Sequence, residues 1–384
     1  MKTPLAWLNL IHNRMRTSAA VGGVAFSVLL IFMQLGFLGS VESTASLIFD
    51  ALDFDLVIRS SRYLQLAETR TFPQDRLHQV ASAPGVLRVT PFYVGQNQWR
   101  NPDTGSKRRI LTMGLKPADP VFKVRELQVK AGLLTDPEFG LIDRKSRRDF
   151  GPRDGSQFGD ADVGTETEVA NQRVEIVGHF ALGAGFVADG AIVLNERGFC
   201  RIQPGRTPED VSLGLVKLEV GVSPDAAAAR LQSILPSDVR VFTRTGVADF
   251  ERRFWYREMS IGILFQVGVV VAMVVGTAIV YQVLSSDVTN HLAEYATLKA
   301  VGYGNGYLVK VILQQAIALG LMGFLPGMLL AEVVYRITTY VANVPVVMNV
   351  GRVVFVLAIS LGMCAVSGLG ALRKVRSADP ADLF

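Results

Sequence analysis

Four long stretches of the chain carry no charged residue, and they constrain the fold more than any other feature of the sequence. They cover residues 17–41, 259–286, 311–331 and 353–372, with lengths of 25, 28, 21 and 20 residues. A helix needs about 20 mainly apolar residues to cross a hydrocarbon core of roughly 30 Å. The sequence therefore predicts an α-helical membrane protein with four transmembrane helices per chain. The first stretch is too long for the apolar core of a signal peptide, so we expect a retained anchor.

Composition supports this prediction and excludes several other classes of protein. Hydrophobic residues make up 49% of the chain and charged residues only 19%, which argues against an ordinary soluble, disordered or fibrous protein. The net charge is +5, yet residues 41–258 hold 29 basic and 29 acidic residues. The positive surplus therefore lies beside the apolar stretches, where a nucleic-acid-binding surface is not expected.

The positions of Lys and Arg near the apolar stretches predict the orientation. Eight of these residues flank one side of the spans and two lie in the opposite short loop, so both termini are expected in the cytoplasm of a multi-pass inner (plasma) membrane protein. This topology gives a cytoplasmic N-terminus with the first span (1–41), an extracytoplasmic domain with its stalk (42–258), the second span (259–286), a cytoplasmic coupling loop (287–310), the third span (311–334), a short external loop (335–352), the fourth span (353–372) and a cytoplasmic tail (373–384).

The region between the first two spans reads as a folded α+β domain. Its first part predicts strands at 53–59, 86–94 and 108–115 with a helix at 73–83. Its last part predicts a strand at 215–222, a helix starting at Ser223-Pro224-Asp225 and a strand at 239–243. We expect these outer parts to form one α+β lobe, with a second, mainly β lobe from residues 141–201 inserted in it.

Residues that carry catalytic or metal chemistry are not arranged in any recognisable motif. The four histidines are scattered, no metal-ligand spacing occurs, and a phosphate-binding GxxxxGK[ST] loop is missing. The sequence therefore predicts no catalytic residue, no metal site and no ATPase activity in this chain. Cys200 and Cys364 are expected to be free thiols.

Small residues suggest how the spans pack. Gly323 and Gly327 in the third span, and Ala272 and Gly276 in the second, repeat at the four-residue spacing that lets helix backbones approach closely. Membrane helices are rich in glycine in any case, so these residues could also reflect composition alone.

The loop between the second and third spans predicts a short amphipathic helix that ends at Gly302. Tyr295, Leu298 and Val301 form an apolar stripe, flanked by Glu294 and Lys299. Such a helix could lie on lipid headgroups, or it could dock into a groove of another protein as a coupling element.

This loop resembles the signature of FtsX/MacB-type ABC transporter permeases. Six residues match that signature, with Ala293 in place of the usual arginine before them: Glu294, Ala296, Leu298, Lys299, Ala300 and Gly302. The resemblance covers the whole chain. Within the family, the segments 143–151, 294–303 and 379–384 are similar to the DevC-type permeases of heterocyst glycolipid exporters.

The resemblance implies a homodimeric permease subunit that works with two copies of a separate ATPase, which would bind ATP and Mg. It also implies a porter-like lobe with an inserted β-rich lobe on helical stalks, and a role in transmitting motion. The DevC type implies export of a lipid or other amphipathic cargo with a periplasmic adaptor and an outer-membrane duct. Two alternatives stay open: an FtsX-type permease that regulates a cell-wall hydrolase, and a receptor that needs no ATPase.

Overall fold

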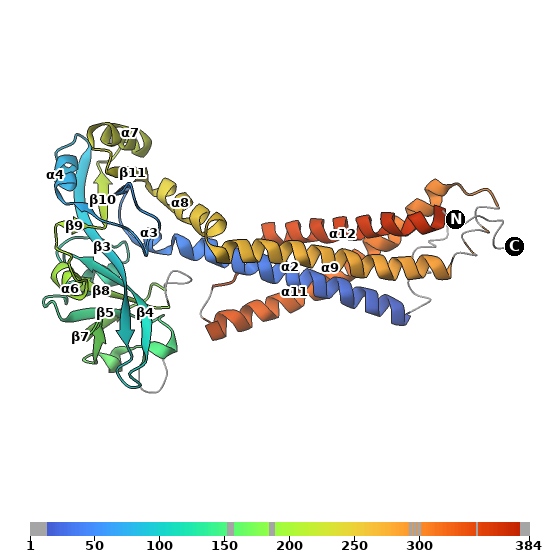
Figure 1. The fold of residues 1–384 in the computed structure, drawn as a ribbon, viewed down its shortest axis with the longest axis horizontal. Coiled ribbons are helices and arrows are strands. Elements are labelled where there is room, and N and C mark those ends of the chain that lie inside the picture. The colour runs from blue at the N-terminus through green and yellow to red at the C-terminus, as the bar shows by residue number, and fades with distance from the viewer. Residues whose placement is uncertain are drawn as a thin grey trace. The chain divides into compact units, whose positions relative to one another are not determined.

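A computed structural model describes residues 14–151, 157–183, 189–291, 294, 297, 301–342 and 345–376 of the chain. The chain forms two compact units. The helical unit consists of Met1–Gly39, Ser260–Val341 and Val346–Phe384, and the sheet unit of Ser40–Met259 with Ala342–Pro345. Figure 1 labels the elements of both units.

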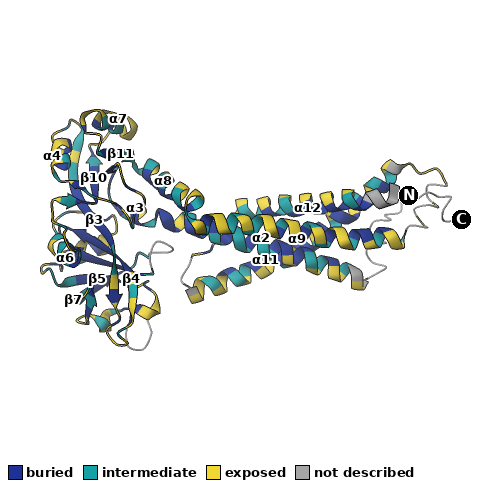
Figure 2. Cartoon of the chain, viewed as in Figure 1, coloured by how far each residue is buried: buried dark blue, intermediate teal, exposed yellow. Residues whose placement is uncertain are grey.

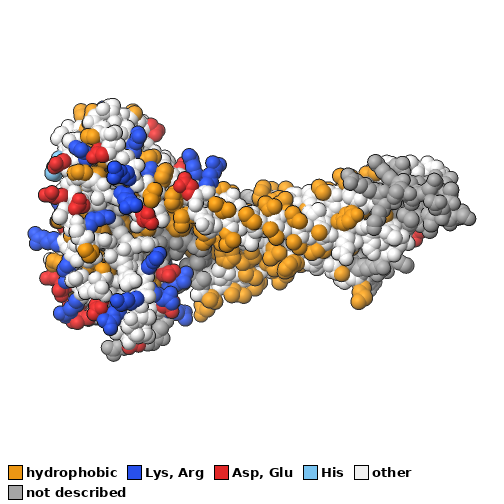
Figure 3. Space-filling view, in the orientation of Figure 1, with side chains coloured by type: hydrophobic (Ala, Val, Ile, Leu, Met, Phe, Trp, Pro, Cys, Tyr) orange, Lys and Arg blue, Asp and Glu red, His pale blue; other side chains and the backbone are white. Residues whose placement is uncertain are grey.

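The long helices of the chain, as far as it is described, include four that are apolar enough to cross a membrane. They are α2 (Arg14–Ala45), α9 (Ser260–Asn290), α11 (Asn305–Ala342) and α12 (Val350–Arg376). They extend beyond the charge-free stretches, because only the part of a helix inside the hydrocarbon must lack charges and its ends can continue in water. Hydrophobic side chains cover the visible face of this unit (Figure 3), and many α9 residues are exposed (Figure 2), Leu264 and Val274 among them.

The outer lobe of the sheet unit has the β-α-β-β-α-β order of a ferredoxin-like fold. Its sheet runs β11-β1-β10-β3 and is antiparallel throughout. The elements in chain order are β1 (Leu56–Ser60), α4 (Asp75–Ala81), β3 (Val86–Arg100), β10 (Leu213–Leu218), α7 (Pro224–Ile234) and β11 (Val239–Thr243). The predicted α+β lobe is confirmed, including the helix that begins with Pro224 after Ser223.

The inserted lobe is a closed sheet of strands. In the described residues its order is β3-β4-β8-β5-β7-β6, and β6 pairs again with β3. The strands are β4 (Lys107–Leu115), β5 (Phe139–Asp143), β6 (Glu166–Val169), β7 (Gln172–Phe180) and β8 (Ala191–Asn195). The sequence placed residues 108–115 in the outer lobe, which is wrong. The long strand β3 pairs with β10 through its first half and with β4 through its second half, so the chain has already entered the insert at β4.

Shorter elements complete the sheet unit. They are α3 (Leu47–Ala51), β2 (Phe72–Pro73), α5 (Arg125–Ala131), η1 (Arg148–Phe150), η2 (Asp160–Asp162), α6 (Glu196–Ile202), β9 (Asp210–Val211) and α8 (Arg244–Arg257). After α8 the chain continues within two residues into α9.

The two lobes have separate hydrophobic cores. In the outer lobe, α4 and α7 bury Leu77 and Leu231 against Leu56 and Ile58 of β1. Since side chains alternate along a strand, Arg59 points to the opposite face of the same sheet. The core of the closed sheet is built around Trp99.

Candidate functional site

The loop after α9 contains the residues that the sequence assigned to coupling. Glu294 and Thr297 are helical, and the Val301 amide donates a hydrogen bond of 3.0 Å to the Thr297 carbonyl. Gly302 follows with a φ of +101°, a conformation that favours glycine and ends the helix. Four further coupling residues lie outside the described residues: Tyr295, Ala296, Leu298 and Lys299.

His291 lies between two carboxylates in this loop. Its Nε2 is 3.7 Å from Asp287 Oδ1, and its Nδ1 is 3.1 Å from Glu294 Oε1. The imidazole is 17% exposed and the Glu294 side chain 63% exposed. Asp287 also accepts a hydrogen bond of 3.4 Å from the amide of Gln315 on α11. The end of α9, Glu294 in the following loop and Gln315 of α11 are therefore joined by a series of polar contacts.

These contacts can position Glu294 while its carboxylate stays accessible to solvent. His291 contacts both carboxylates, while the exposed side of Glu294 stays available to a basic group on another protein. The sequence treated His291 as isolated. The spacing of Asp287, His291 and Glu294, at four and then three residues, is the spacing at which helical side chains are neighbours, and it is the signal that was missed.

Gly323 and Gly327 lie where α11 crosses α2. A Cβ on Gly323 would come within 2.5 Å of Val24 Cβ, and a Cβ on Gly327 within 2.6 Å of the Ala25 carbonyl oxygen. Real Cβ atoms essentially never approach other atoms this closely. Glycine at both positions therefore permits the backbone contact between the two helices.

Ala272 and Gly276 lie on the packed side of α9. Ala272 is buried, and a Cβ on Gly276 would come within 2.8 Å of Ser27 Cβ on α2 and 2.5 Å of Met363 Sδ on α12. Close by, the Ser367 hydroxyl of α12 donates a hydrogen bond of 2.8 Å to the Thr277 carbonyl. The small residues of α9 thus place this helix against both α2 and α12.

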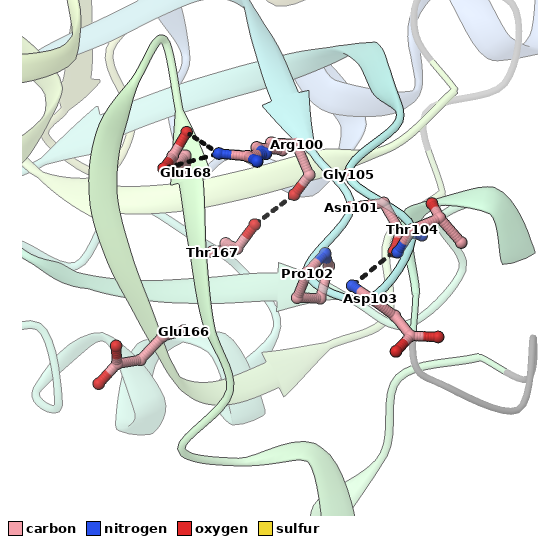
Figure 4. Close-up of a pocket in the computed structure, with 9 residues that line it drawn as sticks. All are labelled: Arg100, Asn101, Pro102, Asp103, Thr104, Gly105, Glu166, Thr167 and Glu168. Atoms are coloured by element: carbon pink, nitrogen blue, oxygen red, sulfur yellow. Dashed lines mark hydrogen bonds and ion pairs between the residues drawn. The ribbon is translucent and has the colours of Figure 1, made fainter.

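A polar hollow of about 330 Å³ opens in the sheet unit beside the turn between β3 and β4. Arg100 donates hydrogen bonds of 3.0 and 3.1 Å to the Glu168 carboxylate, and Thr167 donates to the Arg100 carbonyl (Figure 4). Asn101 accepts from the amides of the following turn. These groups form hydrogen bonds with one another where β6 pairs with β3. The polar lining of the hollow is therefore explained by its structural role in closing the sheet.

Groups suited to metal binding do not converge in the part of the chain that the structure describes. Three or more His, Cys, Asp or Glu side chains are nowhere gathered there in a way that could hold a metal ion. His179 on β7 pairs its Nε2 with Asp160 Oδ1 at 2.7 Å, and Cys200 and Cys364 are free thiols.

Comparison with known families and proteins gives matches over both units. Residues 17–234, more than half of the chain, match the MacB-like periplasmic core domain, and residues 267–380 match the FtsX-like permease C-terminal family. Two uncharacterized ABC transporter permeases of Mycobacterium tuberculosis, from strains CDC 1551 and H37Rv, are each 22% identical over 364 residues, or 94% of this chain and 93% of theirs.

Two solved structures are also similar in fold to this chain. The extracellular domain of the noncanonic ABC-type transporter YknZ from Gram-positive bacteria has a TM-score of 0.34 at 16% identity and covers 50% of this chain and 99% of its own. The periplasmic region of MacB from Actinobacillus actinomycetemcomitans has a TM-score of 0.37 at 8% identity and covers 52% of this chain and 92% of its own.

Proposed function

Because the chain belongs to the family of FtsX-like and MacB-like ABC transporter permeases, we propose that it transmits ATP-driven motion from a separate ATPase to its sheet unit. The observation that carries this proposal is the series of polar contacts from Gln315 through Asp287 and His291 to Glu294. It ties the loop between the second and third spans to both of the helices that the loop connects. A displacement of the loop is thereby passed to α9 and α11 together.

The composition of the spans favours transmission of motion over conduction through the bilayer. The stretches 17–41, 259–286, 311–331 and 353–372 contain no Asp, Glu, Lys, Arg or His. Proton relays and ion pathways in membranes are built from such residues. A permease without such residues in its spans is suited to move a large domain, while its cargo takes a route that does not pass between the spans.

In this proposal the working unit is a homodimer with both termini and the 287–310 loop in the cytoplasm. ATP and Mg are bound by the partner ATPase, and this chain holds no cofactor. The sheet unit works outside the membrane with a periplasmic adaptor and an outer-membrane duct. Its cargo is a lipid or another amphipathic molecule, as the likeness of residues 143–151 to DevC-type permeases suggests.

Affinity purification of the tagged full chain from native membranes tests this proposal. We expect an ABC ATPase and a periplasmic adaptor to co-purify with it. An ATPase together with a cell-wall hydrolase, and without an adaptor, would instead support the FtsX-type signalling function. Recovery of the chain without any ATPase, under conditions that preserve a known ABC complex, would contradict the proposal.

A further inference from the structure

A buried cluster of charged and aromatic side chains fixes α8 to the sheet unit. Glu251 on α8 is 0% exposed. Its Oε1 accepts a hydrogen bond of 2.5 Å from the Tyr63 hydroxyl, and its Oε2 accepts one of 3.4 Å from the Leu66 amide. Both donors belong to the loop that follows β1. The Glu251 carboxyl group is thus held by the loop after β1, although the two lie far apart in the sequence.

Arg59 is the buried positive charge of the same cluster. It is 5% exposed, and its guanidinium carbon lies 3.8 Å from the Phe250 ring centroid, 4.1 Å from that of Phe242 and 4.4 Å from that of Tyr63. Its Nε and Nη1 atoms have no hydrogen-bond partner among the residues described. Three aromatic faces therefore take the place of direct partners, which is a favourable but weaker way to hold a desolvated cation.

The cluster joins the elements against which α8 packs. Arg59 lies on β1, Phe242 on the neighbouring strand β11, and Phe250 and Glu251 on α8 itself. Arg59 projects from the face of the sheet opposite to α4 and α7. The position of α8 on that face therefore depends on this cluster.

We infer that Arg59, Tyr63 and Glu251 form a latch that holds α8 against the sheet, and that a proton on Glu251 closes it. The latch would fix the segment that leads into α9, so its part in transmitting motion rests on the proposed function. Its existence in the chain does not depend on any partner. A neutral Glu251 suits a site without water. An ionised Glu251 would be a buried negative charge, which the hydrogen bonds from Tyr63 and Leu66 and the nearby Arg59 cation compensate only in part.

The electrostatics of the site support this inference. Burial raises the pKa of the Glu251 carboxyl from 4.5 to about 7, although the hydrogen bonds from Tyr63 and Leu66 and the charge of Arg59 act in the opposite direction. Burial and the nearby Glu251 also raise the pKa of Tyr63, so this side chain remains a neutral donor. A carboxyl whose pKa is higher in the closed state takes up a proton on closing. Closure is therefore most favourable below pH 4.5 and weakens as the pH rises from about 4.5 to about 7.

Other charged groups of the packed elements point away from the cluster into solvent. They are Arg62, Glu68 and Arg70 in the loop after β1, Arg240 on β11, and Asp249, Arg252, Arg253 and Arg257 on α8. Arg244, at the start of α8, is partly buried and donates hydrogen bonds of 2.9 and 2.8 Å to the carbonyls of Phe49 and Asp50. Arg252 pairs with Asp249 at 3.2 Å on the exposed side of the helix. Glu251 is therefore the carboxyl whose titration acts on the latch.

Hydrogen exchange of the full chain in lipid nanodiscs, without any ATPase, tests the latch. Protection factors of the α8 amides, corrected for the intrinsic effect of pH, should fall at least about tenfold between pH 5 and pH 8 in the wild type. Glu251→Gln keeps an acceptor for Tyr63 but cannot ionise, so its protection should be independent of pH. Asp249→Asn, on the exposed side of the same helix, should retain the wild-type pH dependence.

A second variant keeps the test decisive if Glu251→Gln does not fold. Tyr63→Phe removes a hydrogen bond that lowers the pKa of the Glu251 carboxyl, so the pKa in the closed state should rise and the loss of protection should extend to higher pH than in the wild type. Protection of wild-type α8 that does not change between pH 5 and pH 8 would overturn the inference, as would a pH dependence that survives in Glu251→Gln. Failure to recover an ATPase would contradict the proposed function and leave this result unaffected.

Discussion

His291 and Glu294 lie three residues apart in the chain, and Nδ1 of His291 is 3.1 Å from Oε1 of Glu294. The pair is partly open to solvent, so its own contribution to stability is about 0–1 kcal/mol. Its importance lies in orientation. It holds the Glu294 carboxylate at a defined place on the loop, while Asp287 and Gln315 connect the same loop to α11.

Reversal of the charge at position 294 should disrupt coupling without unfolding the chain. In Glu294→Lys a cation faces His291 and the basic group that we expect on the ATPase, at a cost of about 2–5 kcal/mol if that contact is buried in the complex. Stimulation of ATP hydrolysis by the permease should therefore fall at least about tenfold. Glu294→Gln should be milder.

Glu219→Lys, at an exposed position of the sheet unit, provides the matched control and should couple normally. Wild-type stimulation in Glu294→Lys, at equal abundance in the membrane, would show that the ATPase is not held through this charge.

Packing of α11 on α2 should be sensitive to the size of the residue at position 323. Gly323→Val forces a side chain into Val24, so overpacking should destabilise the helical unit by about 1–3 kcal/mol. Thermal unfolding of the full chain in detergent measures the change. Gly362→Val is the control, because a Cβ at Gly362 meets nothing within 4 Å. Equal melting temperatures for the two variants would contradict this packing.

The features that the sequence predicted well are those with a local pattern. The apolar spans follow from length and charge, and the start of α7 follows from Ser223 and Pro224. The assignment of β4 to the outer lobe was wrong because strand pairing depends on partners that are distant in the chain. The contact between Tyr63 and Glu251, 188 residues apart, has no periodic signal and emerges only when the loop after β1 and α8 are brought together by folding.

The closed sheet of the insert should depend on Trp99. This side chain is fully buried, its indole donates a hydrogen bond of 2.9 Å to the Phe150 carbonyl, and its ring lies 6.1 Å from that of Phe158. Trp99→Ala should destabilise the sheet unit by about 3–5 kcal/mol. Limited proteolysis of the full chain measures this loss as faster cleavage. Val129→Ala, at a side chain that is 70% exposed, should behave like the wild type within about 0.5 kcal/mol.

Cysteine labelling tests the expected orientation. In a chain with serine at positions 200 and 364, Thr104→Cys in the exposed turn after β3 should react with an impermeant thiol reagent in intact spheroplasts. Ser377→Cys, which follows the basic end of the last span, should react only after the membrane is permeabilised. The reverse pattern would invert the predicted topology.

Photo-crosslinking from position 294 tests most directly whether the loop after α9 is where the ATPase docks. A photoreactive amino acid at position 294 should give a covalent adduct with the ATPase in native membranes, and the same amino acid at Glu219 should give none. An ATPase that co-purifies with the chain yet forms no adduct from position 294, while it is crosslinked from other cytoplasmic positions, would contradict the assignment of this loop as the coupling site.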